Sequence, residues 1–173
     1  MGEIKSTLDL VMERTKHLSM SAEEKTRQHQ EDFSRRLQGL LQQFGDGGLT
    51  LKAFDERLDA LQTELEIADT GLVLNATLGR IDPDGENGPW LALLGELAPA
   101  TREPLEKILQ SHREARTALV EEARSRQLER LAREKGIGGS AVVPNPNRDA
   151  DFQQRLEGLC QQIRQRIDAL AYA

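Results

Sequence analysis

Aromatic side chains are scarce in this chain of 173 residues, because Phe, Trp and Tyr together make up 3% of it. Sheets draw heavily on aromatic and β-branched residues, so the scarcity disfavours a fold built on strands. It also removes the stacking platform on which proteins that bind single-stranded nucleic acid rely. The composition therefore favours helices built on Leu and Ala, and we expect no nucleic-acid partner.

Cysteine and long apolar runs are nearly absent as well. A single cysteine, Cys160, rules out an intramolecular disulfide, and its position at the edge of an apolar stripe predicts a small core residue. No apolar run approaches the ~20 residues that cross a bilayer, and the polar, charged start of the chain is not that of a signal peptide. We expect a cytoplasmic protein without a membrane-spanning helix.

Motifs that carry chemistry are missing too. The three histidines, His17, His29 and His112, lie on separate predicted helices, and no His-x-x-x-His or Glu-x-x-His pair places two metal ligands on one face. No Gly-x-Ser-x-Gly elbow and no dinucleotide-binding fingerprint occurs. We therefore expect no catalytic residue, no cofactor and no metal, and we expect His112 to be a packing residue on an apolar face.

One sequence motif, which we call the phrase, occurs three times in the chain. The first copy runs from Phe33 to Phe44, the closest match from Phe152 to Ile163, and a looser third from Phe54 to Leu65. Each has Phe, then Arg-Leu, a small residue, Leu and a final apolar residue. At about 100° per residue the apolar positions fall within roughly 60° of a helix surface. We expect the first copy and the closest match to be buried against the long helix described next.

Helix signals continue along the chain and predict an all-α protein, an elongated helical bundle of five or six helices. Residues 1–20 form an N-terminal helical arm, residues 21–135 the bundle core, residues 136–149 an extended loop, and residues 150–173 a C-terminal helix that packs on the core. The longest helix is expected at about residues 102–135, because apolar residues follow one slowly drifting face there.

Two further stretches are candidate interaction sites, beside the phrase faces that begin at Phe33 and Phe152. The most apolar run contains Trp90, Leu91 and Leu94, and it is either a buried short helix or an exposed docking patch. The loop at 136–149 is longer than a plain connector needs. Its β-branched patch, with Ser140, Val142 and Val143, is either an ordinary linker or a segment that docks on another chain.

The opening residues 2–15, Gly-Glu-Ile-Lys-Ser-Thr-Leu-Asp-Leu-Val-Met-Glu-Arg-Thr, resemble those of a family of small bacterial helical proteins of unknown function. The stretch Gly139-Ser-Ala-Val-Val-Pro-Asn145 is similar to the same group. The resemblance covers little of the chain. It implies a bacterial, cytoplasmic protein and no particular activity.

The favoured function is that of a non-enzymatic interaction or scaffold protein with an unknown protein partner. Apolar stripes longer than the chain readily covers alone predict a homodimer. The charge is unevenly distributed, because residues 1–100 have a net charge of -8 and residues 101–173 a net charge of +2. This asymmetry favours head-to-tail contact between the two halves. One alternative is a sensor of a small ligand or metal near Trp90 and His112. Another, ranked last, is a peripheral membrane protein that uses the first helix.

Overall fold

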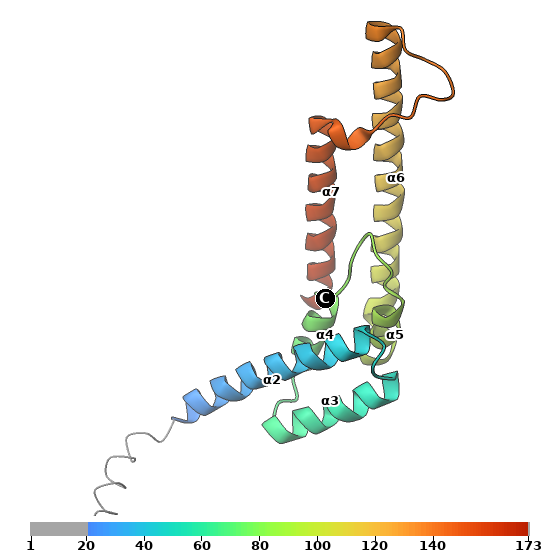
Figure 1. The fold of residues 1–173 in the computed structure, drawn as a ribbon. Coiled ribbons are helices and arrows are strands. Elements are labelled where there is room, and N and C mark those ends of the chain that lie inside the picture. The colour runs from blue at the N-terminus through green and yellow to red at the C-terminus, as the bar shows by residue number, and fades with distance from the viewer. Residues whose placement is uncertain (1–20, 173) are drawn as a thin grey trace, which may run out of the picture. The chain divides into compact units, whose positions relative to one another are not determined.

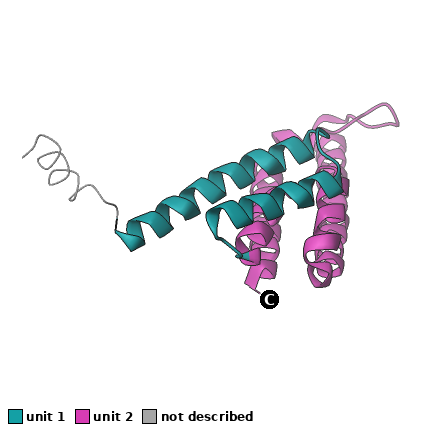
Figure 2. Cartoon of the chain, turned by 90° about the horizontal axis from the view of Figure 1, so that it is seen from below, with its two compact units in different colours: residues 1–69 teal, residues 70–173 magenta. Residues whose placement is uncertain are grey.

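A computed structural model describes residues 21–172, and the expected arm at 1–20 lies outside these residues. The described part is all-α, as predicted, with six α-helices, two short 3-10 helices and no strand (Figure 1). The chain divides into two compact units, residues 1–69 and residues 70–173, which Figure 2 colours separately. This boundary falls inside 21–135, the range expected to form one core.

Unit 1, as far as it is described, is a hairpin of two helices, α2 (Ala22–Gly45) and α3 (Leu51–Leu65). Ser21 begins α2 with a capping box, because its hydroxyl accepts from the Glu24 amide while the Glu24 carboxylate accepts from the Ser21 amide. Thr50 caps α3 through its hydroxyl, which accepts from the Ala53 amide. Gly47, at φ 76°, turns the chain between the two helices.

The first and third copies of the phrase pack on each other in this hairpin. The rings of Phe44 and Phe54 lie 5.3 Å apart between centroids, and α2 and α3 contact each other along their length. The long helix was the partner expected for the first copy, and the sequence did not suggest α3. All eight apolar positions of the two copies are buried: Phe33, Leu37, Leu40, Phe44, Phe54, Leu58, Leu61 and Leu65.

Equivalent polar positions of the two copies also meet across the hairpin, with approximate two-fold symmetry. Arg36 of α2 donates two hydrogen bonds to Glu64 of α3, at 2.6 and 2.7 Å. Arg57 occupies the same place in the third copy as Arg36 in the first, and it donates to Gln43 at 3.0 Å. The arginine of the phrase is therefore a bridge between helices, and its hydrogen bonds lower the pKa of the Glu64 carboxyl.

A residue in the left-handed conformation ends α3. Glu66 has φ 56° and stops the helix after Leu65. The Nδ1 atom of His29 lies 3.1 Å from the Leu65 carbonyl oxygen, to which it donates. It thus satisfies a carbonyl that the end of a helix leaves without an intrahelical partner.

Unit 2 contains α4 (Thr70–Leu78), α5 (Gly88–Leu97), α6 (Pro99–Lys135) and α7 (Ala150–Ala169). The long helix predicted at 102–135 is present and begins slightly earlier, at Pro99. α7 runs antiparallel to α6 and packs along it (Figure 1). The short 3-10 helices η1 (Pro146–Arg148) and η2 (Leu170–Tyr172) flank α7.

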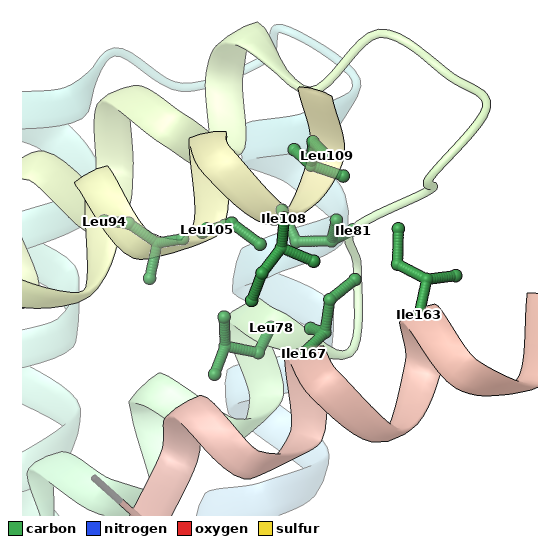
Figure 3. Packing of buried hydrophobic residues seen from close by; sticks show 8 residues of the cluster. All are labelled: Leu78, Ile81, Leu94, Leu105, Ile108, Leu109, Ile163 and Ile167. Carbon is green, nitrogen blue, oxygen red and sulfur yellow. The ribbon is translucent and has the colours of Figure 1, made fainter. Parts of the chain in front are cut away.

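The core of unit 2 brings α4, α5, α6 and α7 together (Figure 3). A second cluster joins Phe152 of α7 to Leu119 and Ala123 of α6. The closest match of the phrase is therefore buried at its two ends, Phe152 and Ile163, against the long helix, as expected. The main cluster consists of Leu78, Ile81, Leu94, Leu105, Ile108, Leu109, Ile163 and Ile167.

The side of α7 away from this stripe faces solvent. Cys160, expected to be a small core residue, is exposed, because the contact with α6 is narrow and leaves the edge of the stripe uncovered. Among residues 21–172, no helix has both the length and the apolar character needed to cross a membrane.

Candidate interaction surface

The predicted interaction residues separate into buried and accessible ones. Phe33 and Phe152 are 0% and 2% exposed, and Leu94 belongs to the core of unit 2, so none of the three is available to a partner in this conformation. Trp90 and Leu91 are half-buried against the same core. The five residues are therefore packing residues in whole or in part.

The loop at 136–149 holds the accessible ones. Ser140 is exposed, Val142 is half-buried, and Val143 is 84% exposed. The β-like patch forms a turn, in which the Val142 amide donates to the Gly139 carbonyl at 3.2 Å. Four large hydrophobic residues of the described part are exposed, and three of them lie between residues 128 and 143: Leu128, Ile137 and Val143, with Tyr172 as the fourth.

Backbone geometry and two amide side chains hold this loop in place. Gly136, left-handed at φ 62°, ends α6, and the Ile137 amide donates back to the Leu131 carbonyl at 3.2 Å. The buried Gln127 of α6 donates to the Asn145 carbonyl at 3.1 Å, and Gln153 of α7 donates to the Asn147 carbonyl at 2.8 Å. The loop is thus tied to both helices near its end, while its middle stays exposed.

The C-terminal part of α6 extends beyond the start of α7. Phe152, in the first turn of α7, packs on Ala123 of α6, and α6 continues to Lys135. Residues 124–135 form about 18 Å of helix at 1.5 Å per residue, and Figure 1 shows them extending past the start of α7. We call these residues together with the loop 136–149 the end surface.

A hollow of about 310 Å³ lies in the end surface beside the start of α7. At 100° per residue, Arg126, Arg130 and Arg133 continue the stripe of α6 that includes Leu119 and Ala123. Arginine thus replaces leucine and alanine where α7 no longer covers the helix. The hollow is lined by Arg126, Gln127, Glu129, Arg130, Arg133 and Asp149.

The charges near this hollow are only partly paired. Arg126 donates to Asp151 at 2.7 Å, a bond that raises the pKa of its guanidinium. Nearby, Arg155 of α7 donates two hydrogen bonds to the Glu122 carboxylate of α6, at 2.7 and 2.8 Å, and these bonds lower the pKa of that carboxyl. The side chain of Arg130 makes no ion pair or hydrogen bond within the described part of the chain. The basic end of the hollow is therefore open to a charged ligand.

The phrase builds a second kind of hollow, one in each unit. The hollow in unit 1 measures about 420 Å³ and the one in unit 2 about 380 Å³. Both are lined by the same four places of the phrase, which are Arg, Gly, Leu and Gln. In α2 these are Arg36, Gly39, Leu40 and Gln43, and in α7 they are Arg155, Gly158, Leu159 and Gln162.

His112 is buried, as expected, and its polar contact is with a loop. Its Nε2 atom lies 3.1 Å from the Asp84 carboxylate, which Arg116 also approaches at 3.2 Å. Its Nδ1 atom has no hydrogen-bond partner. Neither His112 nor Trp90 lines any of the three hollows described here. Within residues 21–172, no three His, Cys, Asp or Glu side chains form a group that could hold a metal ion.

The arginine hollow was not predicted from the sequence. The available signal was positional, because Arg126, Arg130 and Arg133 occupy the stripe that is apolar from Leu105 to Ala123. Comparison of the chain with family models, curated proteins and solved structures gave no match. The end surface is therefore interpreted from its own chemistry.

Proposed function

We propose that the chain is a non-enzymatic helical interaction protein that binds a partner through the end surface, residues 124–149. One observation carries the proposal. Of the four exposed large hydrophobic residues in the described part, Leu128, Ile137 and Val143 lie within this surface. Exposed large apolar side chains are thus concentrated in one stretch of the chain, and surfaces that bind other molecules commonly expose such side chains.

The construction of the loop supports the same proposal. Gln127 and Gln153 fasten its later part to α6 and α7, so that Val143 is presented on a supported backbone. A supported loop loses less conformational entropy when a partner binds it than a free segment of equal length does. Residues 136–149 are thus better suited to recognition than an unfastened connector is.

A photocrosslinking amino acid placed in the full-length protein in its native cells tests the proposal. At Val143 it should give a discrete crosslinked product, and at Gln161, an exposed residue of α7, it should not. The double change Ile137→Ser and Val143→Ser, with the crosslinker moved to Ser140, should remove the product while the helical circular dichroism signal is retained. Equal products at Val143 and Gln161 would contradict the proposal.

The homodimer is a separate proposal, and the structure weakens the argument from uncovered apolar stripes that led to it. The apolar stripes that prompted it are buried within one chain, at Phe33–Phe44 and at both ends of Phe152–Ile163. Light scattering at micromolar concentration decides it, since a compact monomer would exclude a dimer. The ligand or metal sensor, the membrane role of the first helix and the cytoplasmic location remain predictions.

A further inference from the structure

The arginine hollow suggests which chemistry the partner brings, an inference that rests on the proposed function. The hollow is lined by α6 residues beyond the part of α6 that contacts Phe152, and by Asp149 just before α7. In that part, α6 offers Leu119 and Ala123 to Phe152. Beyond it, the same face offers Arg126, Arg130 and Arg133. A second helical segment, placed end to end with α7, would meet three guanidinium groups there.

These guanidinium groups are only partly neutralised from within unit 2. Residues 124–135 carry five basic and two acidic side chains. The Arg130 side chain has no ion pair or hydrogen bond within residues 21–172. Arg133 has an 81% exposed side chain and reaches only its neighbour Glu134, at 3.7 Å. Arg126 alone is held firmly, through Asp151, and it forms the fixed inner edge of the hollow.

We propose that the hollow takes a carboxylate-bearing helical segment of a partner protein. Arg130 and Arg133 are three residues apart on one helix face, which matches carboxylates spaced three or four residues apart on a facing helix. Each guanidinium can donate two parallel hydrogen bonds to one carboxylate. The segment would lie along α6, in line with α7.

Two other occupants fit the charges less well. A nucleic-acid backbone would bring continuous phosphates against Glu129 and Asp149, which also line the hollow. A second copy of the same helix end would bring a second excess of basic groups against the first, a like-charge contact. A helical segment with spaced carboxylates avoids both conflicts, because it can place an uncharged or basic residue opposite Glu129.

The test uses the purified full-length protein and two synthetic peptides of about four helical turns. The probe peptide is an amphipathic helix with Glu at positions i, i+4 and i+7, and the control peptide has Lys at those positions. Amide chemical shifts in two-dimensional NMR report where each peptide binds. The acidic peptide should shift amides at 122–135 and 149–152, and raising the salt concentration should weaken its binding. The basic peptide should shift none of them.

A matched pair of variants separates local recognition from net charge. Arg130→Glu with Arg133→Glu should lower the affinity for the acidic peptide at least tenfold. Arg113→Glu with Arg166→Glu changes the net charge equally, at two exposed arginines of α6 and α7, and should alter the affinity less than twofold. Equal losses for the two pairs, shifts that fall outside the hollow, or no binding by the acidic peptide would each overturn the inference.

Other outcomes identify a different occupant and also overturn it. A fall in sedimenting mass caused by Arg130→Glu with Arg133→Glu would assign the hollow to a second copy of this chain. A single-stranded RNA probe that shifts the same amides would assign it to nucleic acid. If the acidic peptide does not bind while the crosslinked product at Val143 persists, the proposed interaction function stands and only the inference of an acidic helical partner is rejected.

Discussion

The glycine in the middle of α7 gives the most sharply defined prediction. Gly158 lies within Ala150–Ala169, and a Cβ atom built on it meets nothing within 4 Å. Alanine is favoured over glycine in a helix interior by ~1 kcal/mol, because glycine loses more backbone entropy on folding. Gly158→Ala should therefore raise the free energy of unfolding of unit 2 by about 1 kcal/mol.

The expected shift is measurable by thermal and urea unfolding followed by circular dichroism. For a domain of about 100 residues, 1 kcal/mol corresponds to a change in Tm of roughly 4–8 °C. The urea m-value should stay constant, because the substitution changes neither state's exposed surface appreciably. Gly39→Ala, in the corresponding place of α2, also meets nothing within 4 Å and should stabilise unit 1 in the same direction.

Gly136→Ala is the matched control, since it makes the same chemical change in a different backbone conformation. Gly136 ends α6 in the left-handed region, at φ 62°, where an L-residue costs roughly 1–2 kcal/mol. This variant should lower the Tm of unit 2. A lower Tm for Gly158→Ala would refute the reasoning, because it would mean that another chain packs closely on the hollow that Gly158 lines.

Three more predictions concern the packing and the charges. Phe54→Ala removes a fully buried ring that contacts Phe44 and should destabilise unit 1 by about 3–5 kcal/mol in urea unfolding; a loss below about 1 kcal/mol would show that the hairpin is not held by this contact. Asp84→Ala removes the polar partner of the buried His112 and should cost about 1–3 kcal/mol, with faster hydrogen exchange in residues 82–87; unchanged exchange there would exclude a fastening role. Arg36 and Arg155 lower the pKa values of Glu64 and Glu122. The two ion pairs therefore stabilise the fold fully above the ordinary carboxyl pKa of 4.5, and this stabilisation is lost as the pH falls through the lowered pKa. Arg36→Gln with Arg155→Gln should flatten the acid limb of stability against pH between pH 7 and 3, and an unchanged limb would mean that the bridges contribute nothing.

Local signals in the sequence predicted the helices well. The capping box at Ser21 and Glu24, the cap at Thr50 and the glycines after Phe44 act within a few residues, so that sequence alone locates the ends of α2 and the start of α3. The end of α3 escaped prediction, because Glu66 takes a left-handed conformation that glycine or asparagine adopts more readily. His29, which donates to the Leu65 carbonyl at this helix end, is distant in the sequence.

Pairing between helices was harder to predict than the helices themselves. The stripe from Phe33 to Phe44 is equally suited to any apolar helix face, and the pattern does not say which. The structure gives it α3, where Arg36 reaches Glu64 and Arg57 reaches Gln43. These bridges depend on the antiparallel register of two copies of the phrase, which appears only when both are placed on facing helices.

The candidate surface was predicted in part. The loop with Ser140 and Val143 was suggested by its length and its β-branched residues, and both are exposed in the structure. The arginine hollow depends on where α7 begins relative to α6, a property of packing. For the apolar run with Trp90, the sequence left open a buried helix or an exposed docking patch, and the structure packs the run into the core, as apolar runs of this length commonly do.

The most direct measurement of the central claim is hydroxyl-radical footprinting of the protein isolated with its partners from its native cells, compared with the purified protein alone. Val143 and Tyr172 are almost equally exposed, at 84% and 86%, and they lie at opposite ends of α7. If the end surface binds the partner, oxidation of Val143 and Ile137 should fall severalfold in the complex while that of Tyr172 stays unchanged. Protection of Tyr172 without protection of Val143 would contradict the account.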